Sequence, residues 1–417
     1  MSKNLSEKLG GIKPGTLFAG VDLAKDRNLT VVINQQGKRL TRFYFPNDKD
    51  GYEYHRRRLE KLRQQQQAPT VMVGMEPTNY FWKLLAADLE GHEQFPYRLV
   101  NAYTVKKHRE GDQIDRAKDD PRDGFTIADL LRTGKFTQTQ LLKGAYADLR
   151  QYAAMYDRVR KEIGRRKTLM QVAVGEVFPE ISLVFKDITR GTARAMLHRH
   201  AVPADICVLT EAEFIAAVRT DYTGKRMEIG KLHQAYRLAF DSVGLVDTRA
   251  PQMAVGLHAA ELALKQAHLA TITTALLETF YSLPKAAYML SMGLGQVTTA
   301  LIAAEIGDPR RYRSAKQLVK LAGIQPTPNH SGRKTRSATP MSGRGRPRLR
   351  TVLYFASLRQ IQQDPAFAQL YQQLQQRKRN PLTGKQALGV VMNKTLHVLW
   401  SLIRQQTFYD SNRLLAV

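Results

Sequence analysis

Residues 16–24 read TLFAGVDLA, a short apolar run with β-branched and aromatic side chains and a single acid, Asp22. Such a run is typical of a buried strand. Residues 29–45, LTVVINQQGKRLTRFYF, continue the pattern as two more strand-like runs about a Gln-Gly turn. The sequence therefore predicts three strands in hairpin succession, preceded by a flexible tail at residues 1–15.

The following segments alternate between helix and strand patterns. A polar helix is expected at residues 47–66, a buried strand at 70–76 and an amphipathic helix ending at a glycine at 79–91. A fifth strand at 97–102 and a further helix at 125–135 follow. Strands and helices in this order indicate an α/β layered domain. We place it at about residues 16–140.

The rest of the chain is predicted to be helical. Residues 141–280 contain two long segments near helical spacing with short helices between them, which fits either a coiled-coil arm or a helical bundle. Residues 281–417 begin with two apolar segments about a Gly-Leu-Gly, similar to a helix-hairpin-helix, and continue with a basic helix at 309–324. Two amphipathic helices, at 349–363 and 385–406, close the chain.

Composition favours a polyanionic partner. The 417 residues carry a formal net charge of +27, with a pI of about 10.1 and a hydrophobic fraction of 43%. Binding to phosphates releases condensed counterions, so nucleic acid is the leading partner. The polar N-terminus and the lack of an apolar stretch of roughly 18 residues argue against a leader and a membrane span. The single cysteine, Cys207, excludes an intrachain disulfide, and a reducing cytoplasm is the expected location.

The strongest charge signal is the basic segment, residues 328–350, PNHSGRKTRSATPMSGRGRPRLR. It contains no Asp or Glu, and none occurs from Pro309 to Gln363. The segment has two interpretations: a solvated linker that contacts phosphates, or a loop that presents a serine to DNA. Its candidate nucleic-acid-binding residues are Arg333, Lys334, Arg336, Arg344, Arg346, Arg348 and Arg350.

Carboxylates in the first domain occupy positions where an unpaired charge is costly. Asp22 lies in the first strand, and Glu76 ends the strand VMVGME. Asp120 and Asp123 precede a helix, where they can act as N-cap and capping-box residues about Pro121. The same spacing places both acids near one face of the helix start. Four such carboxylates can hold Mg²⁺, because hard cations prefer oxygen ligands.

The order of these motifs resembles the DEDD insertion-sequence transposases, which are related to Piv-type DNA invertases and include bridge-RNA-guided recombinases. The similarity lies in GVDLAK, GMEPT, VNAYTVKKHR and D-x-x-D at the first domain, and in MGLGQVTTALIAAEIGDPRRYRSAKQLVKLAGIQP, HSG and RGRPRLRTVLY near the C-terminus. It covers about residues 16–140 and 281–405. The helical middle is similar to the family's coiled-coil linker, although residues 176–260 are longer than expected.

The resemblance implies three domains. They are a RuvC-like, RNase H-type DEDD domain at 16–140, a helical or coiled-coil arm at 141–280, and a mainly α-helical serine transposase domain at 281–417. The implied acidic tetrad, which would bind Mg²⁺, is Asp22, Glu76, Asp120 and Asp123. The family motif K-T-D-x-x-D-A here has Asp119 in place of Thr and Gly124 in place of Ala, so Asp119 competes with Asp120.

The resemblance also assigns the catalytic serine to Ser331, with Ser337 and Ser342 as alternatives. Ser342 falls at a basic, phosphate-binding position of the family pattern. The function implied is site-specific DNA recombination through a serine–DNA covalent intermediate, by a homo-oligomer guided by a noncoding bridge RNA. The competing hypotheses are a Mg²⁺-dependent nuclease or junction resolvase that uses the tetrad alone, and a non-enzymatic nucleic-acid-binding protein.

Overall fold

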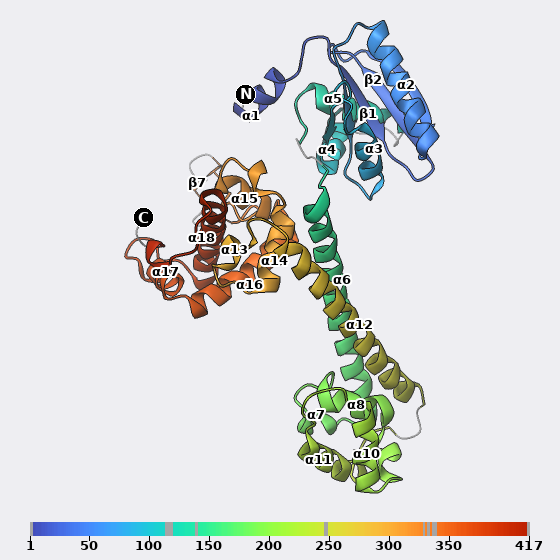
Figure 1. Cartoon of the computed structure of the whole chain (residues 1–417), viewed down its shortest axis with the longest axis vertical. Coiled ribbons are helices and arrows are strands. Elements are labelled where there is room, and N and C mark those ends of the chain that lie inside the picture. The colour runs from blue at the N-terminus through green and yellow to red at the C-terminus, as the bar shows by residue number, and fades with distance from the viewer. Residues whose placement is uncertain are drawn as a thin grey trace. The chain divides into compact units, whose positions relative to one another are not determined.

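The computed structural model describes residues 3–112, 120–137, 141–245, 249–327, 330–331, 334–335 and 340–414 (Figure 1). The chain forms two compact units, Met1–Leu142 and Lys143–Val417. The first is mixed α/β and the second is almost entirely helical, so the predicted change from an α/β domain to a helical remainder is confirmed.

The first unit is built on a five-stranded sheet with the order β3-β2-β1-β4-β5. Its strands are β1 (Leu17–Asp22), β2 (Arg27–Ile33), β3 (Arg39–Pro46), β4 (Val71–Met75) and β5 (Tyr97–Leu99). The first three pair antiparallel as the sequence predicts, whereas β4 and β5 run parallel to β1. The carboxyl ends of β1 and β4 therefore lie at the same edge of the sheet.

Helices cover both faces of this sheet (Figure 1). On one face, α2 (Lys49–Gln65) and α3 (Phe81–Leu89) contribute Leu59, Leu85 and Leu89 to a core with β1 and β4. On the other, α4 (Ala102–Asp112) and α5 (Asp120–Arg132) cover the sheet with Val105, Ile127 and Leu131 among their buried side chains. The three layers are those of an α/β domain and are compatible with a RuvC-like fold.

Two expectations for this unit need correction. The predicted flexible tail is wrong at Lys3–Gly10, which form helix α1. Leu5 and Leu9 of α1 lie beside Gly134, where a Cβ would meet Leu5 Cδ1 at 2.8 Å, so the helix is anchored by apolar packing that its polar sequence hides. Helix α4 was also missed, because its residues have little apolar periodicity and, among its described side chains, only Val105 is buried deeply against the sheet.

The second unit begins with two long helices, α6 (Gly144–Val177) and α12 (Arg249–Tyr281), which pack along each other in opposite directions (Figure 1). Ion pairs join them at Arg166–Glu261, 2.7 Å, and Lys265–Glu162, 2.6 Å. Short helices lie between them in sequence, as predicted, and form a separate apolar core with the ends of the long pair. They are α7 (Ile181–Val184), α8 (Gly191–Arg199), α9 (Pro203–Cys207), α10 (Glu211–Asp221) and α11 (Ile229–Phe240).

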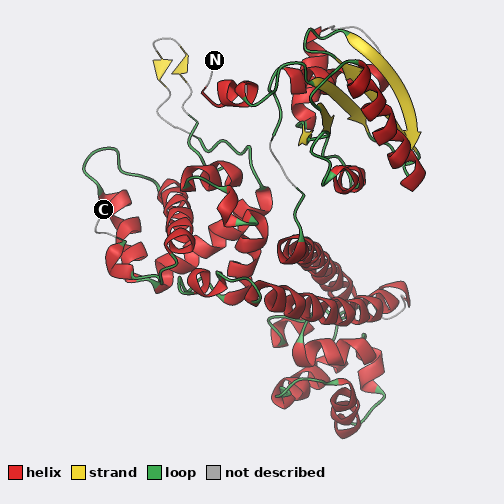
Figure 2. Ribbon diagram, turned by 45° about the horizontal axis from the view of Figure 1, so that its top comes forward, coloured by secondary structure: helices red, strands yellow, loops and turns green. Residues whose placement is uncertain are grey.

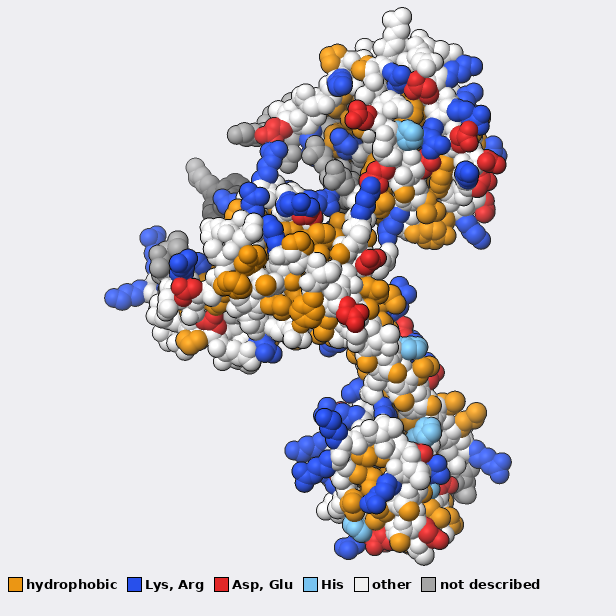
Figure 3. All heavy atoms as spheres, viewed as in Figure 1, with side chains coloured by type: hydrophobic (Ala, Val, Ile, Leu, Met, Phe, Trp, Pro, Cys, Tyr) orange, Lys and Arg blue, Asp and Glu red, His pale blue; other side chains and the backbone are white. Residues whose placement is uncertain are grey.

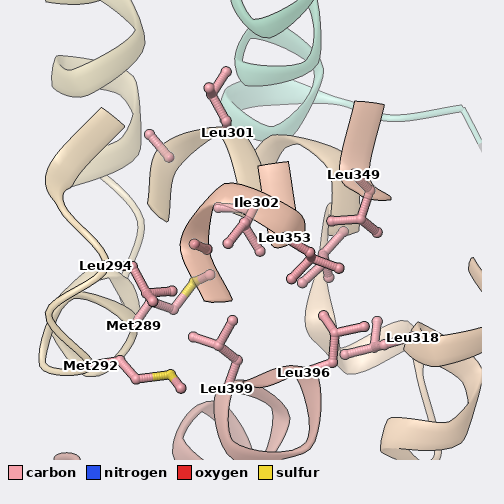
Figure 4. Close-up of a cluster of buried hydrophobic side chains, with 14 of the residues drawn as sticks. Met289, Met292, Leu294, Leu301, Ile302, Leu318, Leu349, Leu353, Leu396 and Leu399 are labelled. Atoms are coloured by element: carbon pink, nitrogen blue, oxygen red, sulfur yellow. The ribbon is translucent and has the colours of Figure 1, made fainter. Parts of the chain in front are cut away.

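The C-terminal part of this unit is a helical cluster with one large core. Its helices are α13 (Ala286–Leu290), α14 (Gln296–Ile306), η1 (Pro309–Arg311), α15 (Ala315–Ala322), α16 (Pro347–Gln363), α17 (Pro365–Gln376), α18 (Gly384–Gln405) and η2 (Ser411–Arg413). Figure 4 shows part of this core, in which Ile302 and Leu353 face Leu396 and Leu399. The turn between α13 and α14 uses positive φ at Gly293 and Gly295, 70° and 86°, which favours glycine.

The predicted basic helix at 309–324 is wrong in its first half. A 3₁₀ turn at Pro309–Arg311 precedes α15, which begins only at Ala315. The Asp308 side chain accepts a hydrogen bond from the Arg310 backbone N–H and so stabilises the turn. Two short strands, β6 (His330–Ser331) and β7 (Lys334–Thr335), form a separate antiparallel ribbon (Figure 2). No helix within the described ranges is both long and apolar enough for a membrane span.

Candidate acidic site and serine segment

Asp22 and Glu76 lie side by side at one edge of the sheet. Asp22 is the last residue of β1, and Glu76 directly follows β4. Val21 pairs with Met75 in the parallel register, so the two acids occupy the next matching position. Neighbouring strands are about 4.8 Å apart, and side chains alternate between the faces. The backbone therefore directs both carboxylates to the face that carries α5.

Helix α5 crosses this face unusually closely. A Cβ on Gly20 would lie 2.0 Å from the Gly124 carbonyl oxygen and 2.5 Å from the Ala128 nitrogen. A Cβ on Gly124 would lie 2.9 Å from Val31 Cγ2. Because both glycines lack a side chain, the first turns of α5 pack directly on β1 and β2. Gly20 lies two residues before Asp22 and on the same face of the sheet. Asp123, next to Gly124, is 7% exposed and belongs to the same end of the domain.

The sequence motif thus brings three carboxylate-bearing positions to one edge. Helix α5 begins at Asp120, whose side chain lies outside the described residues, as does all of Asp119. Within the described part of the chain, no three His, Cys, Asp or Glu side chains are grouped closely enough to hold a metal ion.

Ser331 lies in the short β6–β7 ribbon. Its register partner across the ribbon is Lys334. The side chains of both residues lie outside the described residues, together with the whole of Arg333, Arg336 and Ser337.

Ser342, the second described serine of the basic segment, has a structural role. It is half-buried, and its Oγ donates a hydrogen bond to the Gly323 carbonyl at 3.2 Å. Its backbone N–H donates to the Gln325 carbonyl at 2.9 Å. These contacts join the segment to the end of α15. Arg344, nearby, is exposed.

The remaining arginines of the basic segment contact the protein itself. Arg348 Nη1 lies 3.0 Å from Glu305 Oε1, and Arg346 Nη1 lies 3.7 Å from the other carboxylate oxygen. Arg350 Nη1 donates to the Ala322 carbonyl at 3.0 Å and the Gly343 carbonyl at 3.3 Å. These three side chains are half-buried and position the start of α16.

Glu305 is the centre of this network and was missed by sequence reasoning. It is 4% exposed on the apolar helix α14. Arg150 of α6 donates to the Ala304 and Glu305 carbonyls at 2.6 and 2.9 Å. Burial, with Arg346 nearby, lowers the pKa of the Arg150 guanidinium to about 10, so it remains charged at neutral pH. The sequence signal for this network was Glu305 itself, a single acid in the apolar run ALIAAEI. A buried carboxylate needs a cation, so a basic partner could have been predicted.

Positive charge continues over α15 and α18. Burial, followed by the fields of Lys394 and Lys316, lowers the pKa of His397. Lys316 and Lys320 are exposed on α15. Figure 3 shows Lys and Arg side chains spread over the visible faces of both units. The charge expected from composition is therefore available to phosphates on the second unit.

Two profiles of known protein families match parts of this chain. The profile of the DEDD transposases of the IS110 type, described as "Transposase", matches residues 19–179. A second profile, "Transposase IS116/IS110/IS902 family", matches residues 288–372. The first match contains the acidic positions and the second contains the basic segment. The two matches together cover more than half of the chain.

Individual relatives carry similar names. The mini-circle protein named as transposase for IS117, from Streptomyces coelicolor, is 26% identical over 76% of this chain and 78% of its own length. The IS116 protein of Streptomyces clavuligerus is 22% identical over 94% of this chain and 96% of its own. The pilin gene-inverting protein of Moraxella bovis is 29% identical over 28% of this chain and 36% of its own.

The fold, the acidic edge and these matches define a DNA-recombining enzyme of the transposase class. The chain belongs to the IS110 family of DEDD transposases. Enzymes of the DEDD class generally depend on a metal ion.

Proposed function

We propose that this transposase is a site-specific recombinase that exchanges DNA strands through a covalent bond between Ser331 and DNA. The observation that carries the proposal is the matching register of Asp22 and Glu76, with α5 laid over them at Gly20 and Gly124. Carboxylates that come from distant parts of the sequence to one edge of the sheet are suited to bind a shared cation. The domains at 16–140, 141–280 and 281–417 are then a RuvC-like DEDD domain, an arm and a serine transposase domain.

The chemistry begins at the serine hydroxyl. Its Oγ attacks phosphorus, its proton is transferred to a base, and the displaced DNA oxygen takes up a proton as it leaves. The phosphate is then esterified to Ser331. A hydroxyl of a second strand attacks this ester and restores the serine, so the phosphodiester energy is conserved and no nucleotide cofactor is required. Lys334, opposite Ser331 in register, is proposed to neutralise the charge that develops on phosphate.

The proposed metal ligands are Asp22, Glu76, Asp120 and Asp123, or Asp119 in place of Asp120. Their carboxylate oxygens suit a hard cation such as Mg²⁺. Such an ion would polarise the phosphate and stabilise the leaving oxygen. The protein's own part is to hold these acids at one edge of the sheet.

Two partners complete the proposal. The acid-free stretch from Pro309 to Gln363 and the +27 charge suit donor and target DNA, and they are compatible with the guide RNA that the family resemblance implies. For a homo-oligomer, the candidate contact is α12, on which Met253, Leu257 and Leu264 are 68%, 54% and 55% exposed at heptad-like spacing.

A strand-exchange assay with the element ends and the adjacent noncoding RNA tests the serine assignment. Ser331→Ala should abolish exchange, because no other hydroxyl replaces the attacking Oγ. Ser342→Ala is the matched control, since this serine is bonded to Gly323, and it should retain most activity. Wild-type exchange by Ser331→Ala, or its loss only in Ser342→Ala, would refute the assignment.

The same assay tests the acidic site. Asp22→Asn and Glu76→Gln should each lower exchange on the order of 100-fold or more, because each removes a charge that holds the cation. Calorimetric titration with Mg²⁺ should show weaker binding in both variants. Asp26→Asn, an exposed acid just beyond β1, provides the control. Unchanged binding and exchange in the first two variants would remove the metal from the account.

A further inference from the structure

An open groove of about 460 Å³ lies on the second unit beside α16 and α18. Leu388 and Met392 of α18 line it and are 5% and 3% exposed, so they give it an apolar floor. Tyr354 and Phe355 of α16 also line it but remain 43% and 61% exposed. Their rings meet edge to face with centroids 5.3 Å apart. The groove thus offers aromatic surface on which another planar ring can stack.

The charges of the groove favour an anionic occupant. Arg350 and Lys385 line it, and no acidic residue does. Lys385 is exposed, and Arg350 is half-buried with hydrogen bonds to the backbone carbonyls of Ala322 and Gly343 rather than to a carboxylate. A nucleotide combines a planar base with a phosphate, which matches the aromatic surface and the flanking cations. An apolar protein segment would leave both cations without a counter-charge.

The position of the groove ties it to the serine. Met341 also lines it and forms a β-bridge with Pro326. Next to this bridge, the Thr327 N–H donates to the Pro340 carbonyl at 2.9 Å, which closes the base of the loop that carries Ser331. Ser331 lies four residues beyond Thr327 in the chain, a span of at most about 14 Å. The groove therefore lies within a few nucleotides of any phosphate that reaches Ser331.

We propose that this groove holds one unstacked base of the DNA strand whose phosphate is attacked, stacked against Tyr354 and Phe355 and with its phosphate beside Lys385. The proposal rests on the proposed function for the identity of the strand. Holding a neighbouring base out of the helix would fix the attacked phosphate against the serine, which is the positioning that an in-line displacement requires.

The test uses the full-length protein and a single-stranded DNA oligonucleotide of about 12 nucleotides with one 5-iodouracil. Ultraviolet irradiation should join the iodouracil to Tyr354 or Phe355, as located by mass spectrometry of the digested protein. Phe355→Ala should weaken binding of the oligonucleotide roughly 5- to 100-fold, the range expected for loss of one base stack. Phe355→Trp should restore it.

Phe408→Ala is the matched control, because Phe408 is a phenylalanine of the same unit with 65% exposure and contacts only Tyr288 among aromatic rings of the described residues. Its affinity for DNA should not change. Lys385→Gln should reduce the dependence of log K on log salt by about one unit, as expected for one phosphate contact. Circular dichroism of each variant confirms that the fold is retained.

Three results would overturn the proposal. They are crosslinks only outside the groove, preferential crosslinking of an RNA oligonucleotide of the same sequence, and a change of oligomeric state in Phe355→Ala with unchanged DNA affinity. Ser331→Ala should keep the crosslink at the groove. Failure of the serine chemistry with a retained crosslink therefore counts against the proposed function alone, and loss of the crosslink with intact chemistry counts against the groove alone.

Discussion

Gly20 and Gly124 are the residues that bring α5 onto the sheet beside the acids. Gly124 occupies the position at which the family motif has alanine. A Cβ added there would lie 2.9 Å from Val31 Cγ2, which is too close. The opposing Gly20 has even less room, with backbone atoms of α5 at 2.0 and 2.5 Å from an added Cβ. A backbone contact cannot be relieved by rotating a side chain, so the spacing of α5 from β1 depends on these glycines.

Gly20→Ala should therefore destabilise the first unit by about 3 kcal/mol or more, through overpacking that displaces α5. Trp82 and Trp400 are the two tryptophans, one in each unit, so a Trp400→Phe background isolates the first unit in denaturant titrations followed by fluorescence. Gly10→Ala is the control, because its Cβ would meet nothing within 4 Å. Equal stability of the two variants would contradict the close packing.

His55 makes the stability of the same unit sensitive to pH. It is fully buried on α2 and stacks on Phe45 with ring centroids 4.4 Å apart. Burial, with a smaller effect of Arg56, lowers the pKa of His55 from 6.5 to about 3. The unfolded chain thus binds a proton below about pH 6.5, whereas the folded unit does not until about pH 3. Its free energy of unfolding must fall as the pH decreases through this window.

Between pH 7 and pH 5, the His55 contribution should lower the free energy of unfolding of the first unit by about 2 kcal/mol. Denaturant titrations in the Trp400→Phe background measure it. His55→Leu removes the titrating group, so the free energy of unfolding of the wild type should fall relative to that of the variant as the pH decreases. A difference that is constant from pH 7 to pH 5 would show that His55 does not titrate as described.

The residues that sequence could identify were those whose chemistry conflicts with their surroundings. Asp22 and Glu76 stand out because an acid ends an apolar strand, and the paired register then explains why both are present. Ser342 could not be separated from Ser331 by sequence, because each is followed by glycine in a basic segment. The hydrogen bond from Ser342 to the Gly323 carbonyl joins residues that are far apart in sequence, so no local sequence pattern predicts it.

At the scale of elements, strands and long helices were predictable because each has strong periodicity. Helix α6 occupies the predicted segment at 141–178, whereas α12 begins at Arg249, before the predicted segment at 258–283. Some short elements were not predicted, and α17 is an example: it is a polar helix in which only Ala366 and Phe367 are buried. It begins because Asp364 accepts hydrogen bonds from the backbone N–H groups of those two residues.

Helix α14 depends on its buried acid being paired. Arg348→Gln would leave Glu305 with a weaker set of partners in an apolar core, and the expected loss of stability of the second unit is about 3 kcal/mol. Arg310→Gln is the control, because Arg310 forms an ion pair with Asp308 at the surface, where its side chain is 77% exposed, and stability should hardly change. A Trp82→Phe background reports the second unit through Trp400. Similar effects of the two substitutions would show that the Glu305 network does not stabilise this unit.

At the scale of the whole molecule, net charge and oligomeric state govern the encounter with DNA. A charge of +27 predicts that affinity falls steeply with salt. Composition alone predicted DNA as the partner. The oligomeric state depends instead on surface residues, such as the exposed row of Met253, Leu257 and Leu264 on α12, which composition does not identify.

Leu257→Glu with Leu264→Glu should dissociate the proposed oligomer, because two charges would replace exposed apolar contacts on α12. Sedimentation velocity measures the change in mass. Leu183→Glu is the control, since Leu183 is 83% exposed on α7 and outside that row. An unchanged oligomer in the double variant would place the contact elsewhere.

The central claim is a covalent bond between Ser331 and DNA. The most direct measurement is mass spectrometry of the protein–DNA complex trapped during strand exchange, after digestion of both components. A nucleotide esterified to the peptide that contains Ser331 is expected in the wild type and in Ser342→Ala but not in Ser331→Ala. Cleaved DNA with free ends and no attached peptide would contradict it and would indicate a nuclease that uses the acidic site alone.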